Sequence, residues 1–295
     1  MTIKNLFSGL SLYSATLIAA FSFNSVSFSQ ENPATPQQAA DVKLFYNYPA
    51  DRAVKYLTTN KVIQDMDING QSMKVNVTNV LGCTIKATGM QENNIRLEIS
   101  IDTMDQTLDM MGAISGGLVK EAIGKTFSMT ISPEGKEADL SGAEQVVFRA
   151  SNGDSANVAQ YFNDFFPDMP AEPISPGFTW SSSDSSITKT SSMTRKELVK
   201  SESKFEGFEK VGEINCAKIT FLISGTQEMK MQSQGMDIKT YGPFVGKGEL
   251  YFAPADGYFI KQVVSTRLQG TLEMVSDGAT IPLVMEISSV NEVQK

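Results

Sequence analysis

Alternation of apolar and other side chains at period two runs through most of this chain, and it constrains the fold more than any motif. In the last such run, Ile281, Leu283, Met285 and Ile287 fall on one face. Successive side chains of a strand point to opposite faces, so this pattern indicates a strand with one buried face. Turn residues separate the runs, and Asn69-Gly70 is the strongest short hairpin signal among them.

The alternating runs predict a mainly β protein. They cover 52–66, 73–88, 95–104, 127–131, 136–140, 178–182, 195–210, 214–231, 236–252, 258–275 and 281–290. A flat sheet of this width is unusual, because strands twist and wide sheets curl. We therefore expect one large, strongly curved antiparallel sheet, a half-barrel, with a few short helices covering one face.

Two stretches break the alternation and are expected to supply those helices. Residues 113–123 place Ile114 and Leu118 at helical spacing, although Gly116-Gly117 weakens the pattern. Residues 142–166 indicate two short helices, 143–150 and 155–165, and four prolines then mark a connector.

The first 29 residues have the pattern of a secretory signal peptide. Lys4 precedes an apolar run over 6–23, and small residues ahead of Gln30 indicate cleavage near Ser29/Gln30. Residues 30–40, rich in Pro, Gln and Ala, have the composition of a flexible tether. We expect an exported protein, either periplasmic or extracellular.

The rest of the chain, 41–295, is expected to form a single β-rich domain. It also admits division into two similar halves, 41–141 and 177–295, joined by a helical segment over 142–176. One sequence does not distinguish a repeat from the ordinary similarity of successive hairpins.

Composition argues against enzymatic chemistry. The chain has no histidine, which is the usual acid–base side chain at neutral pH and the commonest metal ligand. No G-x-S-x-G elbow is present. We expect a protein that is not an enzyme, with no catalytic residues. The net charge of −8 also disfavours nucleic acid as a partner, since such proteins normally show a basic face.

One acidic segment resembles the start of a calcium loop. Residues 65–70 read Asp-Met-Asp-Ile-Asn-Gly, but Asn76 stands where the loop requires a bidentate Glu. The expected flanks are strands rather than helices. A hairpin turn with exposed acids explains the segment, so we expect no metal site and no cofactor.

Methionine is the unusual enrichment, with 15 residues. Its flexible thioether side chain lines adaptable apolar surfaces. The residues we expect to line a ligand cavity are Met110, Met111, Ile114, Leu118, Met129, Met229, Met231 and Trp180. In this interpretation the predicted 113–123 helix is a lid, or it is permanently docked on the sheet. Ordinary core packing is the alternative for each methionine.

Cys83 and Cys216 are the only cysteines. An exported protein permits a disulfide between them. The alternation predicts a buried Cys83, whereas Cys216 shares a face with Lys218 and Thr220. A bridge and two separate thiols both remain open.

Four segments, 56–59, 125–136, 176–180 and 246–258, resemble an uncharacterised family of exported bacterial proteins, known as a domain of unknown function. More distantly, that family is similar to half-barrel lipoprotein carriers of the LolA and LppX type. The resemblance implies a curved sheet and a helical lid around an apolar cavity for acyl chains. It assigns no functional residue.

Together these patterns predict an exported, non-enzymatic protein that binds a hydrophobic or lipid-like molecule in a cavity under the curved sheet. The alternative is a structural or protein-interaction module of the cell envelope. That alternative predicts an exposed apolar patch or a long unpaired edge strand that meets an envelope protein partner.

Overall fold

The computed structural model describes residues 41–294, apart from 51, 69, 151–154, 190–192, 234–235 and 277. The predicted signal peptide and tether lie outside the described residues. The first strands are β1 (Val54–Ile68), β2 (Gln71–Gln91), β3 (Asn94–Met110), β4 (Ala113–Leu118), β5 (Thr126–Ile131) and β6 (Glu137–Asp139). The later strands are β9 (Thr179–Lys189), β10 (Met193–Val211), β11 (Ile214–Ser233), β12 (Met236–Ala253), β13 (Tyr258–Met274) and β14 (Ala279–Val293).

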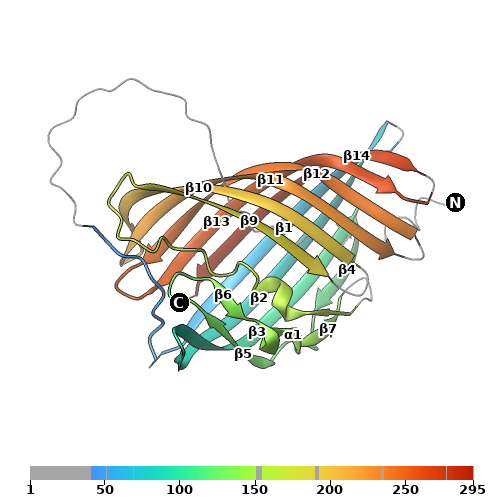
Figure 1. Cartoon of the computed structure of the whole chain (residues 1–295). Coiled ribbons are helices and arrows are strands. Elements are labelled where there is room, and N and C mark those ends of the chain that lie inside the picture. The colour runs from blue at the N-terminus through green and yellow to red at the C-terminus, as the bar shows by residue number, and fades with distance from the viewer. Residues whose placement is uncertain are drawn as a thin grey trace, which may run out of the picture.

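These strands form one large antiparallel sheet that is not closed into a barrel. Its order is β10-β11-β12-β13-β14-β1-β2-β3-β5-β6, with β4 on β3 and β9 beside β10. Figure 1 shows the sheet curving around the remaining segments. The predicted fold class is confirmed. Pairing of β14 with β1, where Val293 lies opposite Tyr56, joins the two groups of strands into one sheet.

Every long strand except β9 buries one face, as the alternation predicts; the described side chains of β9 are exposed apart from the half-buried Trp180. In β14 the exposed fractions of Ile281, Leu283, Met285 and Ile287 are 6% or less. The buried hydrophobic side chains of β1, β2, β3 and of β10 to β14 belong to one hydrophobic cluster. Burial of a continuous apolar face is the dominant stabilising term of such a sheet.

The helix expected over 113–123 is wrong, because residues 113–118 form strand β4. The hairpin turns at Met111 and Gly112, whose φ angles of 53° and 86° suit a tight two-residue connection. Gly116 and Gly117 also take positive φ, which excludes a helix. β3 is longer than expected, and its last six residues provide the partner edge for β4.

The two helices expected over 143–150 and 155–165 are also wrong. Helix α1 (Ser141–Glu144) is a single turn, and the 3-10 helix η2 (Val158–Tyr161) is equally short. Between them, β7 (Val147–Arg149) pairs with β8 (Ser155–Asn157). The run Val146-Val147-Phe148 explains this, since β-branched and aromatic residues favour strands. Among the described residues, no helix is long and apolar enough to span a membrane.

Residues 158–176, the crossing segment, connect the two edges of the sheet. The segment starts near β6, at one edge, and ends at β9, at the other, so the chain passes across the concave side (Figure 1). Phe162 packs on Phe127 with ring centroids 5.1 Å apart, and Phe165 packs on Tyr56 at 5.6 Å. Aromatic side chains of this segment therefore supply the cover that helices were expected to supply.

An N-terminal segment, residues 41–48, closes one end of the concave side. The amide of Tyr46 donates to the Pro133 carbonyl, and the amide of Asn47 donates to the Gly257 carbonyl. The segment thus spans from the β5–β6 turn to the β12–β13 turn. The rings of Tyr46 and Tyr48 pack on Phe166, which ties this end to the crossing segment.

Candidate functional site

The concave face holds three of the predicted ligand-lining residues. Met129 on β5, Met229 on β11 and Met231 on β11 have exposed fractions of 4% or less. Trp180 on β9 is half-buried and stacks on Phe178, with ring centroids 6.1 Å apart. These positions belong to the apolar lining, but Met129 lies near one edge of the sheet and the other residues lie near the opposite edge.

The other predicted lining residues do not form a lid. Met111, Ile114 and Leu118 are exposed by 78%, 74% and 59%, and Met110 is half-buried. They lie at the β3–β4 hairpin, on an exposed strand and its turn, because the expected helix is a strand. The structure therefore divides the predicted set into a buried group and a surface group.

Cys83 and Cys216 are both buried free thiols. They lie on β2 and β11, which are five strands apart in the sheet order. At about 4.8 Å per strand, the separation is about 24 Å along the sheet, far beyond the reach of a disulfide. Burial raises the pKa of both thiols.

A row of uncharged polar side chains crosses the middle of the concave face. The polar belt consists of Thr58, Asn60, Asn79, Gln106, Gln262, Thr266, Ser289 and Asn291, each with an exposed fraction of 7% or less. Gln106, Asn79, Asn60 and Ser289 lie directly opposite one another on β3, β2, β1 and β14. The belt therefore runs at right angles to the strands.

Six atoms of the belt have no hydrogen-bond partner within the described part of the chain. They are Thr58 Oγ1, Asn79 Nδ2, Asn79 Oδ1, Gln106 Oε1, Thr266 Oγ1 and Asn291 Oδ1. An unsatisfied buried polar group costs about 1–3 kcal/mol. Six of them cost about as much as a domain's whole free energy of unfolding. Buried polar groups of this kind are normally satisfied by internal water or by a bound molecule.

The sequence carried a signal for the belt. Asn60 shares a strand face with Val62, and Asn79 shares one with Val77 and Leu81. Polar residues at positions of the buried parity are unexpected in an alternating strand. Only the register of β1, β2 and β3 places them side by side.

A buried ion pair lies on the same face, on β10. Arg195 Nε is 3.3 Å from Glu197 Oε2, and their side chains are 10% and 8% exposed. Burial raises the pKa of Glu197, and the Arg195 charge opposes that rise. Because the two charges are opposite and lie side by side, the net charge of the pair is zero, and neither charge is left uncompensated in the interior.

Polar contacts hold the crossing segment against the sheet. The Gln106 side-chain amide donates to the Tyr161 hydroxyl, and burial raises the pKa of Tyr161 so that this hydroxyl stays protonated. At the sheet edge, the Glu137 carboxylate accepts a hydrogen bond of 3.3 Å from the Phe166 amide. Burial, followed by the nearby Asp164 charge, raises the pKa of Glu137 to about 8.

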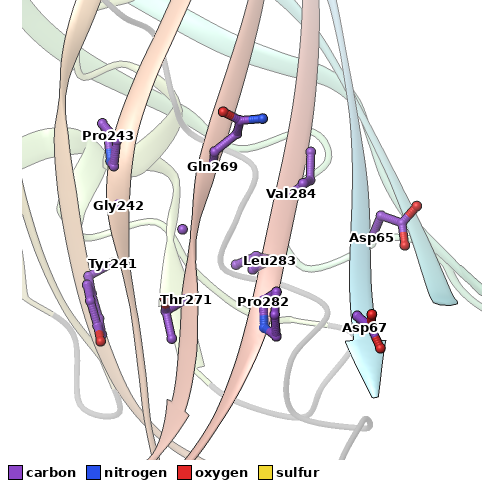
Figure 2. Close-up of a pocket in the computed structure, with 11 residues that line it drawn as sticks. Asp65, Asp67, Tyr241, Gly242, Pro243, Gln269, Thr271, Pro282, Leu283 and Val284 are labelled. Atoms are coloured by element: carbon purple, nitrogen blue, oxygen red, sulfur yellow. The ribbon is translucent and has the colours of Figure 1, made fainter. Parts of the chain in front are cut away.

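Outside the concave side, an open groove of about 540 Å³ crosses four strands (Figure 2). Tyr241, Pro243 and Pro282 line it, with Asp65 and Asp67 at one end. Pairing of β12 with β13 is interrupted after Tyr241, where Pro243 has no amide hydrogen to donate. The groove is shallow, and it results from the interrupted pairing of β12 with β13.

Asp65 and Asp67, from the segment that resembles a calcium loop, form hydrogen bonds within the β1–β2 hairpin. Asp67 accepts a hydrogen bond of 2.7 Å from the Gly70 amide, and Asp65 accepts one of 2.8 Å from the Ser72 hydroxyl.

A second groove, of about 520 Å³, lies along β9, β10 and β11 and includes Trp180. Across residues 41–294, outside the gaps given above, no group of three or more potential ligands is placed to hold a metal.

No protein-family model matches the chain. No curated protein matches it either. Among solved structures, similarity is found to DynF from the dynemicin biosynthesis pathway of Micromonospora chersina, with 8% identity, a TM-score of 0.26 and coverage of 92% of this chain and 95% of that one. OccK2 (OpdF) of Pseudomonas aeruginosa has 7% identity, a TM-score of 0.29 and coverages of 87% and 100%.

The more distant similarities include an outer membrane lipoprotein-sorting protein domain from Vibrio parahaemolyticus, described as putative. It has 10% identity, a TM-score of 0.12 and coverages of 81% and 83%. A DUF1329 family protein from Desulfovibrio piger is similar at 12% identity, with a TM-score of 0.16 and coverages of 81% and 85%. No family match therefore supports the resemblance to an exported family of unknown function, and one distant structural neighbour is the lipoprotein-sorting domain. TM-scores this low carry no argument about function.

Proposed function

We propose that this protein is an exported, non-enzymatic binding protein for a hydrophobic, lipid-like molecule held between the concave face and the crossing segment. One observation carries the proposal. The apolar concave face, with Met129, Met229 and Met231 buried on it, is covered by an irregular segment rather than by a second sheet or a helical layer.

Flexible methionine side chains suit this role, because they repack around acyl chains of different shapes. The ligand enters beneath the crossing segment and replaces part of its aromatic packing. Export is proposed on the pattern of residues 1–29, and the sequence of the mature N-terminus tests it directly. Cleavage is expected near Ser29/Gln30.

Native mass spectrometry of the protein purified from its own envelope fraction tests the binding. We expect a stoichiometric adduct that contains acyl chains and is released by denaturing extraction. Met229→Gln places a polar amide on the apolar lining and is expected to reduce the adduct. Met111→Gln is the matched control, because Met111 is 78% exposed. A clean apo mass from a gentle preparation would contradict the proposal.

A second function, a protein-interaction module of the envelope, is favoured by strand β4. Among the described strands β4 pairs only with β3, and it displays Ile114 and Leu118, exposed by 74% and 59%. An exposed apolar edge strand is a template for pairing with another chain. Cross-linking in the envelope fraction tests this function. Loss of a cross-linked partner with Ile114→Lys, while the lipid adduct persists, would support it.

A further inference from the structure

We infer that the bound molecule carries an uncharged polar group with both hydrogen-bond donors and acceptors, and that this group lies at the polar belt. The inference rests on the proposed binding function and specifies the ligand class. The unpaired polar atoms of the belt carry it, because a face that binds only hydrocarbon has no need of buried polar groups.

The chemistry of those atoms sets the requirement. Thr58 and Thr266 present hydroxyl groups, and Asn79 presents both an N–H donor and a carbonyl acceptor. Gln106 Oε1 and Asn291 Oδ1 only accept. A molecule that satisfies this set needs hydroxyl or amide hydrogens together with carbonyl or ether oxygens. A hydrocarbon or a terpene satisfies none of the six atoms.

The charges on the face exclude an ionised group at the belt. Arg195 is the only charged residue that is buried as a whole residue in the described part of the chain, although the Glu197 side chain is also only 8% exposed. Arg195 is paired with Glu197. A carboxylate or phosphate seated at the belt would lose its hydration without gaining a counter-charge, which is strongly unfavourable.

Apolar rows flank the belt on both sides. Along β2, Val77 precedes Asn79 and Leu81 follows it, and all three side chains are buried on the same face. Hydrocarbon therefore fits on either side of the polar group. A neutral acylglycerol, with its ester and hydroxyl groups between or beside acyl chains, has the required chemistry.

Displacement of a neutral fluorescent dye, N-phenyl-1-naphthylamine, tests the inference. The competitors are 1-monoolein, oleic acid at pH 8 and 1-octadecene, which carry a neutral polar group, a carboxylate and no polar group. Asn79→Leu removes the belt amide at similar volume. Asn76→Leu is the matched control, because Asn76 lies on the same strand and points to the other face. Thr266→Val is a second belt variant of conserved shape.

We expect monoolein to displace the dye from the wild-type protein at about tenfold lower concentration than the other two competitors. Asn79→Leu should weaken monoolein about fivefold to tenfold, as the loss of one or two hydrogen bonds predicts. It should leave octadecene unchanged, and Asn76→Leu should change neither.

Two results separate the inference from the function on which it rests. If the dye binds but monoolein and octadecene compete equally, and the belt variants change nothing, the inference is wrong and the binding function stands. If neither the dye nor any competitor binds the folded wild-type protein, the proposed function fails and the inference fails with it. A fall in the melting temperature of both belt variants without ligand would also count against the inference, because removing an unsatisfied buried group stabilises the free protein.

Discussion

The side-chain amide of Gln106 on β3 donates a hydrogen bond to the hydroxyl of Tyr161 in the crossing segment. This bond joins the polar belt to its cover. The Gln106 side-chain nitrogen finds an acceptor in the crossing segment, while the Gln106 side-chain oxygen has no partner in the described structure. The cover therefore satisfies only part of the belt.

Removal of the Tyr161 hydroxyl should loosen the cover. Tyr161→Phe leaves the Gln106 amide buried without an acceptor, so we expect the free energy of unfolding to fall by about 1–3 kcal/mol. Urea unfolding measures this change, and faster amide exchange over 158–166 should accompany it. Tyr241→Phe, at a tyrosine that is 36% exposed, is the control and should leave both unchanged. An unaltered exchange rate in Tyr161→Phe would show that this bond does not hold the segment.

Stability should fall as the pH rises through the titration of Glu137. Its pKa in the folded protein is about 8, above the ordinary value of 4.5 for a glutamate side chain. The folded state therefore holds this proton more tightly than the unfolded state, and the stability is fully present below pH 4.5 and lost as the pH rises toward 8. Melting temperatures between pH 5 and 8.5 measure the slope. Glu137→Gln, which keeps the acceptor for the Phe166 amide, should flatten the profile, and an unchanged slope would contradict the assignment.

Substitution of a buried methionine should lower the free energy of unfolding much more than substitution of an exposed one. Met129 is 1% exposed, so Met129→Ala should lower the free energy of unfolding by about 2–5 kcal/mol through lost burial and a cavity. Met111 is 78% exposed, so Met111→Ala should stay within about 0.5 kcal/mol of the wild type. Chemical denaturation of the two variants measures the difference. Equal losses would mean that Met111 is covered in solution.

Reducing agent should change neither the melting temperature nor the mass of the protein. Cys83 and Cys216 are separate thiols on strands too far apart to bridge. Thiol titration should therefore find both cysteines reactive after unfolding and almost none before, since both are buried. Detection of an intramolecular disulfide by peptide mapping would contradict the arrangement of the sheet.

The alternating pattern alone predicted the class of fold and nearly every long strand. The runs at 73–88 and 258–275 became β2 and β13 with bounds shifted by a few residues. Period-two alternation is a local property, and it survives because a long strand can bury only one face in an open sheet. The short hairpin at Met111-Gly112 was not predicted, because Ile114 and Leu118 stand at helical spacing and Gly116-Gly117 only weaken that pattern.

The candidate site was decided by tertiary structure. Met129 and Met111 have the same side chain, and their burial differs only because of which neighbours the sheet provides. The polar belt likewise exists only in the register that sets Asn79 between Asn60 and Gln106, residues separated by 19 to 46 positions along the chain. The sequence by itself determined which faces of the strands are apolar. Pairing across the sheet and the path of the crossing segment decided which polar groups are buried together, since those contacts depend on residues far apart in the chain.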